Sequence, residues 1–218
     1  MMKTALIGAS GFVGSAILKE ALNRGHQVAA IVRNPENITP KNENLSIKKG
    51  DVLDEKTVEE LVQGCDAVIS AYNAGWSNPD SYNEFLQGSQ SIQKGVKKSG
   101  VKRYIVIGGA GSLKVAPGIQ AVDTPDFPAE IKPVATAERD CFNILKEGQE
   151  LDWTLFNPAF EMHQGTSGIR KGVYRLGSDN PVFDAESRSV LSVEDLAMAI
   201  TDELEVQKHI RQCFTAAY

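Results

Sequence analysis

Apolar and polar positions alternate in blocks along this chain. Short runs of consecutive apolar residues are typical of strands buried on both faces, and we predict strands at 4–7, 27–32, 45–47, 66–70, 103–107 and 153–156. Between them, apolar residues recur at intervals of three and four, which is typical of helices that pack on one side. We predict helices from about residue 13 and over 55–62, 81–99 and 135–146. Strands that alternate with helices predict a parallel sheet with right-handed crossovers.

The last third of the chain is less regular. Short strands are expected near 173–175, 189–191 and 213–215. Ser192 can cap a helix over 193–204, with Asp195 three residues on. The segment 115–133 is rich in proline and acidic residues, so we predict a loop there. Because no linker, repeat or low-complexity stretch divides the chain, we predict one domain over residues 1–218.

The first predicted strand runs directly into a glycine turn, and a helix follows at once. The turn reads Gly8-Ala9-Ser10-Gly11-Phe12-Val13-Gly14. The first amides of a helix lack internal partners, and the helix dipole makes that end positive. Gly8 would permit the turn, Gly11 the approach of a pyrophosphate, and Gly14 close packing of helix on strand. A turn without a ligand is the alternative, but this strand–turn–helix context favours dinucleotide binding.

We therefore predict an α/β fold: a Rossmann-type doubly wound parallel sheet with a small C-terminal cap. In such sheets, ligands bind at the carboxyl ends of the strands. The second strand of the dinucleotide unit ends in Arg33-Asn34-Pro35. An acidic residue there would hold the ribose 2′-hydroxyl of NAD, whereas a guanidinium suits the 2′-phosphate of NADP. The sequence favours NADP(H) over NAD(H), with an ordinary surface arginine as the alternative.

Composition excludes several classes of function. The chain is 42% hydrophobic and 23% charged, with a net charge of −5 and no lysine- or arginine-rich block, which disfavours nucleic-acid binding. We see no secretory signal and no apolar run long enough to span a membrane. Cys65, Cys141 and Cys213 are odd in number and distant from one another, so they predict neither a disulfide nor a metal site. We expect a cytoplasmic protein, and the sequence leaves its oligomeric state open.

Further short motifs follow the glycine turn in a fixed order. They include Gly50-Asp51-Val52, Ser70-Ala71-Tyr72, Ile107-Gly108-Gly109-Ala110-Gly111-Ser112-Leu113, Asp152-Trp153-Thr154, Asn157-Pro158-Ala159, Leu191-Ser192-Val193-Glu194-Asp195-Leu196-Ala197 and Asp202-Glu203-Leu204-Glu205. This order resembles the atypical short-chain dehydrogenase/reductase superfamily over nearly the whole chain. More narrowly, it resembles small NAD(P)H-binding proteins similar to NmrA and to biliverdin-reductase-B-like enzymes, many of which carry the label NAD-dependent epimerase/dehydratase.

The resemblance implies a role for each of these motifs. Asp51 and Val52 would lie beside the adenine, and Ala71 and Tyr72 along the ribose and phosphates. The nicotinamide side would face the residues that follow two later strands: Gly108, Gly109, Pro158, Ala159 and Phe160. Together with the glycine turn and Arg33, the implied cofactor-binding residues are Gly8, Ser10, Gly11, Phe12, Val13, Gly14, Arg33, Asn34, Asp51, Val52, Ala71, Tyr72, Gly108, Gly109, Pro158, Ala159 and Phe160. A turn aspartate is the alternative for Asp51.

One departure from the resemblance concerns the proton donor. Typical reductases of this family carry Tyr-x-x-x-Lys, whose lysine lowers the pKa of the tyrosine so that it can donate a proton. No tyrosine here has a lysine four residues on. If Glu138 matches the glutamate that follows this motif in some relatives, the lysine position is Val134 and the tyrosine position is Glu130. The usual donor is then absent, which leaves three options. Another group donates the proton; the reaction needs none from the protein, as in hydride transfer to a flavin or quinone whose proton comes from water; or the protein binds NADP without turning it over.

Three residues are candidate replacements: Ser112, His163 and Tyr72. Ser112 follows the fifth strand, where the family often has a catalytic serine, although a turn serine is the alternative. His163 could overhang the site and act as an acid near neutral pH, or be a surface residue. Glu138 and Lys132 could supply an acid or an anchor, although roles on the helix surface are favoured. Tyr72 and Trp76 could form an aromatic wall for a flat substrate, or pack in the core.

These observations leave three hypotheses about function. The first is an NADP(H)-dependent oxidoreductase that passes hydride to a small flat acceptor, such as a flavin or quinone. The second is an NmrA-like sensor that binds NADP without turnover and reports to a protein partner. The third, an NAD-dependent epimerase or dehydratase, is disfavoured by the missing tyrosine–lysine pair and by the small C-terminal third.

Overall fold

The computed structural model describes residues 1–75 and 78–218, and its centre is one mixed sheet. The strands of this sheet are β1 (Lys3–Ile7), β2 (Gln27–Val32), β3 (Leu45–Lys49), β4 (Ala67–Ser70), β5 (Arg103–Ile107), β8 (Asp152–Phe156), β9 (Arg175–Gly177) and β10 (Gln212–Ala217). Their order is β3-β2-β1-β4-β5-β8-β10-β9. All pairs are parallel except β9 with β10, which is antiparallel. The strand order reverses between β1 and β4, where such sheets bind ligands.

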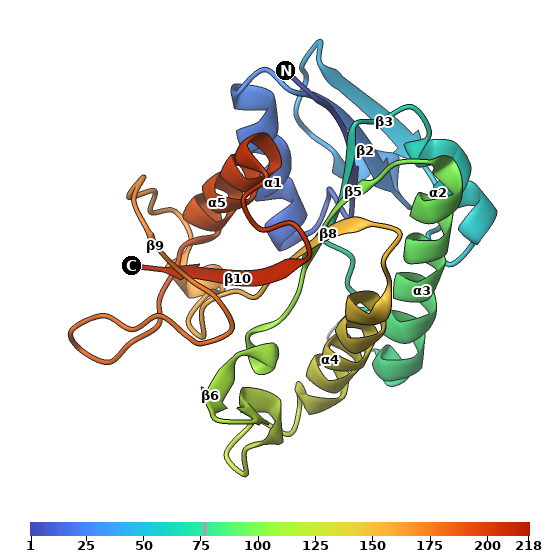
Figure 1. Cartoon of the computed structure of the whole chain (residues 1–218). Helices are drawn as coiled ribbons and strands as arrows, with labels where there is room; N and C mark the ends of the chain where they lie inside the picture. The colour runs from blue at the N-terminus through green and yellow to red at the C-terminus, as the bar shows by residue number, and fades with distance from the viewer. Residues whose placement is uncertain (76–77) are drawn as a thin grey trace.

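Helices cover both faces of the sheet (Figure 1). One face carries α1 (Phe12–Asn23) and α5 (Val193–Val206), which pack side by side. The other carries α2 (Glu55–Val62), α3 (Ser81–Ser99) and α4 (Lys132–Glu147), of which α3 packs against both neighbours. This arrangement confirms the predicted Rossmann-type α/β fold with a mostly parallel sheet.

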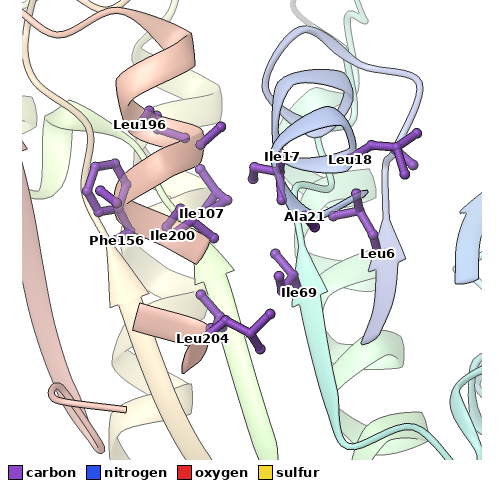
Figure 2. Close-up of a cluster of buried hydrophobic side chains, with 14 of the residues drawn as sticks. Leu6, Ile17, Leu18, Ala21, Ile69, Ile107, Phe156, Leu196, Ile200 and Leu204 are labelled. Carbon is purple, nitrogen blue, oxygen red and sulfur yellow. The ribbon is translucent and has the colours of Figure 1, made fainter. Parts of the chain in front are cut away.

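The alternation of side chains along each strand builds two cores. On β5, Ile105 and Ile107 face α1 and α5, whereas Tyr104 and Val106 face the layer of α2 to α4. Figure 2 shows the first core, where side chains of α1 and α5 meet those of β1, β4, β5 and β8. Because both faces of the central strands are buried, these strands read as continuous apolar runs in the sequence.

The segment 115–133 is not simply a loop, so that prediction was wrong in part. It contains most of a hairpin of β6 (Lys114–Ala116) and β7 (Ile119–Gln120), and α4 begins at Lys132. Gly118 makes the tight turn, with a φ of 76° that other residues rarely adopt. The remaining short 3₁₀ helices are η1 (Pro35–Asn37), η2 (Ala110–Ser112), η3 (Ala121–Asp123) and η4 (Gln164–Thr166).

The C-terminal third departs from its predicted boundaries. The strand expected at 173–175 lies at Arg175–Gly177, and 189–191 forms only one bridge, between Val190 and Glu161. The expected cap at Ser192 is confirmed, because its hydroxyl accepts from the amide of Asp195 at 3.1 Å. Among the described residues, no helix is both long and apolar enough to cross a membrane.

Candidate functional site

A cavity of about 1140 Å³ lies at the carboxyl ends of β1, β4, β5 and β8. Its walls come from the glycine turn, from the segments that follow these strands, and from α4. The lining residues are Gly11, Phe12, Val13, Gly14, Ala71, Tyr72, Asn73, Gly75, Ile107, Gly108, Gly109, Ala110, Gly111, Val115, Ala121, Thr124, Asp126, Phe127, Pro128, Ile131, Ala135, Glu138, Pro158, Ala159, Phe160, Met162, His163, Gln164 and Gly165. The topology thus brings most of the predicted site residues to one place.

The glycine turn at one end of this cavity is tightly constrained. Gly8 has a φ of 77°, and a Cβ there would lie 2.5 Å from the carbonyl oxygen of Ala71. A Cβ on Gly14 would lie only 2.0 Å from the carbonyl oxygen of Gly8. At Gly11 an added Cβ would meet that oxygen at 3.4 Å. The lack of a side chain at Gly8 and Gly14 therefore lets α1 and the segment after β4 approach the turn closely. The need for a glycine is weaker at Gly11.

The N-terminus of α1 is open to an anion. Its N-cap residue, Gly11, offers no side chain, and the first turn has no acidic residue. The amides of Phe12, Val13 and Gly14 are therefore available, together with the positive end of the helix dipole. Ser10 is exposed and does not line the cavity.

Arg33 and Asp51 stand beyond the cavity, after β2 and β3. These strands pair up to Val32 and Lys49, so the two residues follow neighbouring strands at the same edge of the sheet. The exposed Arg33 side chain makes no hydrogen bond or ion pair within the described part of the chain. Asp51 accepts from the amide of Leu53 at 3.0 Å, as a turn aspartate does.

Asn34 and Val52 flank these two side chains. Asn34 is the N-cap residue of η1 without a side-chain hydrogen bond, and Val52 is buried in the core beneath α2 and α3. All four residues thus lie near one another at the carboxyl edge, outside the main cavity.

Tyr72 lines the cavity with its ring but not with a free hydroxyl. The hydroxyl donates to the carbonyl of Glu84 at 3.1 Å, and the ring stacks on Phe85 with centroids 5.6 Å apart. Burial, and then the charge of Glu84, raises the pKa of Tyr72 to about 12. Because its hydroxyl donates to the carbonyl of Glu84 on α3, Tyr72 is poorly placed to donate a proton into the cavity. The geometry of Tyr72 is instead that of an aromatic wall of the cavity. Trp76, the other residue of the predicted aromatic wall, lies outside the described residues.

Ser112 is not brought to the cavity. It is 7% exposed, and its hydroxyl is buried without a partner among the described residues. Gly108 and Gly109, which lie between β5 and Ser112, do line the cavity. The catalytic role predicted for Ser112 therefore has no geometric support.

His163 and the segment after β8 form another wall. Pro158 and Ala159 are buried, and Phe160 is half-exposed with its ring 6.3 Å from that of Phe183. His163 is exposed and caps η4, where its Nδ1 accepts from the amide of Gly165 at 3.0 Å. Because Nδ1 accepts, the neutral imidazole carries its proton on Nε2. His163 therefore has a clear structural role at the rim of the cavity.

Glu138 is more buried than the sequence predicted. It was expected on the helix surface, but it is 6% exposed and lines the cavity, whereas Lys132 is exposed at the start of α4. The spacing of residues in the sequence could have indicated this burial, since Glu138 follows Val134 by four residues and precedes Cys141 by three on the buried face of α4. Sequence reasoning also missed the cavity wall between Val115 and Ile131.

Residues 8–205 match the NAD(P)H-binding family. The chain belongs to this family. The match extends from the glycine turn to the end of α5, so it covers the whole cavity. Members of this NAD(P)H-binding oxidoreductase family bind a dinucleotide, and the open N-terminus of α1 fits that ligand.

Individual relatives are similar over nearly the full chain. The uncharacterised protein YwnB of Bacillus subtilis strain 168 is 38% identical over 216 residues, covering 98% of this chain and 97% of that protein. A structure from Bacteroides thetaiotaomicron, provisionally assigned as an epimerase, is 46% identical with a TM-score of 0.91 and covers 100% and 97% of the two chains. A structure from Streptococcus pneumoniae, provisionally assigned as an NADH-flavin reductase, is 33% identical with a TM-score of 0.87 and covers 100% and 99%.

Proposed function

We propose that this protein oxidises NADPH and reduces a small, flat, largely apolar acceptor of the flavin or quinone type. The observation that carries the proposal is that one cavity of about 1140 Å³ joins the anion-binding helix end to an apolar, aromatic wall. This volume slightly exceeds the roughly 300–1,000 Å³ of ordinary small-molecule pockets. The cavity thus offers room for part of a dinucleotide and for an acceptor beside it.

The chain's own residues would hold the cofactor at two places. The amides of Phe12, Val13 and Gly14 would bind the pyrophosphate. Arg33, free of partners in the described structure, would bind the 2′-phosphate with two charge-assisted hydrogen bonds. The bound cofactor would supply hydride from its nicotinamide, and the protein would orient the reactants and exclude water.

The acceptor is inferred from the opposite walls. Phe127, Ile131 and Phe160 line the cavity, where Ile131 and Phe160 are exposed and Phe127 is half-buried, and Tyr72 adds an aromatic ring. Flat conjugated molecules suit such walls because aromatic rings favour stacked and edge contacts. The relative provisionally assigned as an NADH-flavin reductase supports an acceptor of this class.

Calorimetry with NADPH and NADH, followed by an acceptor panel at 340 nm, tests the proposal. We expect tighter binding of NADPH than of NADH, and oxidation of NADPH by riboflavin or a naphthoquinone. Tight binding without oxidation by any acceptor would refute the reductase and favour the redox sensor. Equal affinity for the two cofactors would refute the role of Arg33 while leaving the reductase intact.

A further inference from the structure

Glu138 is a buried carboxyl group that the fold brings to the cavity without a partner. It is 6% exposed, and it makes no hydrogen bond or ion pair with any other described residue. Its carboxyl group lies directly against Gly109: a Cβ on that glycine would stand 2.0 Å from Oε2. Only a glycine after β5 leaves room for this carboxyl group at the cavity wall.

The position of Gly109 determines where the Glu138 carboxyl group meets the cavity. β5 lies between β4 and β8, and the segments after all three strands line the cavity. The Glu138 side chain of α4 therefore lies against the segment that follows the middle one of these three strands. Both Glu138 and Gly109 line the cavity, so the carboxyl group can reach a bound molecule.

The surroundings of Glu138 favour its protonated form. Arg139, Asp140 and Cys141 follow it on α4. The titratable groups on the elements around it are Tyr82, Glu84, Lys94, Lys97 and Lys98 of α3, Arg103 and Tyr104 of β5 and Asp123 of η3, with Tyr72, Asp126 and His163 on the cavity wall.

None of these groups neutralises the carboxyl group. Arg139, the nearby cation, is bound to Asp123 at 2.6 Å and to Asp140 at 3.1 Å. Burial alone raises the pKa of Glu138 to about 8. At pH 7 the group is therefore mostly a neutral acid with one proton to donate.

We propose that Glu138 is the proton donor of the reaction and takes the place of the missing tyrosine–lysine pair. This inference rests on the proposed oxidoreductase function. While hydride from the bound cofactor reaches the acceptor, the O–H bond of Glu138 breaks and a new O–H or N–H bond forms on the acceptor. The cofactor leaves oxidised, the acceptor leaves reduced by two electrons, and water returns a proton to the carboxylate. The acceptor must therefore carry an oxygen or nitrogen atom, conjugated to its hydride-receiving atom, that lies against Glu138.

The test compares Glu138→Gln with Glu147→Gln, a matched control. Glu147 is exposed on the same helix and makes no hydrogen bond or ion pair within the described structure. Glutamine keeps the size of a protonated glutamate but cannot release the proton. The first readout is a ¹³C NMR titration of glutamate side-chain carboxyls without cofactor, in which the signal missing from Glu138→Gln identifies Glu138. The second is NADPH oxidation by riboflavin and by a naphthoquinone from pH 5 to 10.

We expect the Glu138 carboxyl to titrate near pH 8 in the wild type. The wild-type rate should be flat below about pH 7 and fall tenfold per pH unit above about pH 8. Glu138→Gln should bind NADPH normally but lose about 100-fold or more in rate, as removal of a general acid does, and should lose this pH dependence. Glu147→Gln should match the wild type in every readout.

Three results would overturn the inference. One is a titration near pH 4.5, the ordinary value for glutamate, because the acid would then be ionised at neutral pH. A second is a Glu138→Gln variant with the wild-type rate and pH profile. The third is an unaltered pH profile on a uniformly reduced rate, which would indicate a structural role. Failure of the oxidoreductase itself would look different, because neither the wild type nor Glu147→Gln would oxidise NADPH, and the donor role would fall with it.

Discussion

Glu138→Gln should make the protein more stable at neutral pH, although it removes the proposed proton donor. In the folded protein the carboxyl group is 6% exposed and has no partner among the described residues, so its ionisation is penalised by burial. In the unfolded chain the same group ionises freely. The contribution of Glu138 to wild-type stability therefore falls as pH rises from 4.5 to about 8, whereas glutamine has no proton to lose. Acids at functional sites commonly cost stability in this way.

The magnitude follows from the two pKa values of Glu138. Folding raises its pKa from 4.5 to about 8, so between these values the folded state holds one more proton than the unfolded state. The free energy of unfolding then falls by about 1.4 kcal/mol per pH unit. The 2.5 pH units between 4.5 and 7 therefore correspond to about 3 kcal/mol. Below pH 4.5 both states are protonated and the penalty disappears, and above about pH 8 it is constant.

Urea unfolding from pH 4 to 9 measures this effect. The quantity of interest is the difference in free energy of unfolding between Glu138→Gln and the wild type, which cancels all other titrating groups. It should grow with pH in favour of the variant, by about 3 kcal/mol between pH 4.5 and pH 7. The exposed control Glu147→Gln should show no comparable growth. A difference that stays constant over this range would refute the perturbed carboxyl group, and with it the proton held at the cavity wall.

The other predictions concern the cofactor and the fold. Arg33→Glu should weaken NADPH binding by about 10- to 150-fold, since it removes charged hydrogen bonds of about 1.5–3 kcal/mol, and should change NADH affinity little; calorimetry measures both. Gly14→Ala should destabilise the fold and abolish NADPH binding, because its Cβ would stand 2.0 Å from the Gly8 carbonyl oxygen; thermal unfolding and calorimetry check this. Glu203→Ala should cost about 3–5 kcal/mol in urea unfolding, since it leaves Arg103, bound at 2.6 Å, buried and unpaired.

Matched controls separate these effects from general damage. Gly11→Ala should fold normally, because its added Cβ stays 3.4 Å from the nearest atom. Lys56→Ala breaks an exposed pair of 3.8 Å with Glu60 and should cost less than about 1 kcal/mol. Unchanged NADPH affinity in Arg33→Glu would show that the 2′-phosphate lies elsewhere. A Glu203→Ala cost no larger than that of Lys56→Ala would show that the buried pair adds nothing to stability.

The sequence predicted the sheet and helices well because their signals are local. The strand 27–32 and the helices 55–62 and 81–99 have the predicted boundaries. Each of these elements has a local signal in the sequence, either a buried apolar run or a residue that ends the element. Gly100, for example, ends α3 in the αL conformation. The hairpin between Lys114 and Gln120 was missed because its strands of two and three residues are too short to show alternation, and the rest of the segment is rich in proline and acidic residues.

The candidate site was predicted less completely, since it depends on contacts between distant segments. The glycine turn could be placed because its strand–turn–helix context is local. The burial of Glu138 depends on Gly109, 29 positions earlier in the chain, having no side chain. Likewise, nothing near Tyr72 in sequence indicates that its hydroxyl binds the Glu84 carbonyl. Such pairings are visible only once the strands are in order.

A single-turnover experiment tests the central claim most directly. The protein, saturated with NADPH, is mixed with riboflavin or a naphthoquinone, and absorbance at 340 nm is followed with ordinary NADPH and with NADPH deuterated at the transferred position. We predict a rapid loss of absorbance that requires the protein and is slower with the deuterated cofactor, because the C–H bond breaks within the cavity. Bound NADPH that persists unchanged with every acceptor would contradict the account and leave a protein that binds the cofactor without using it.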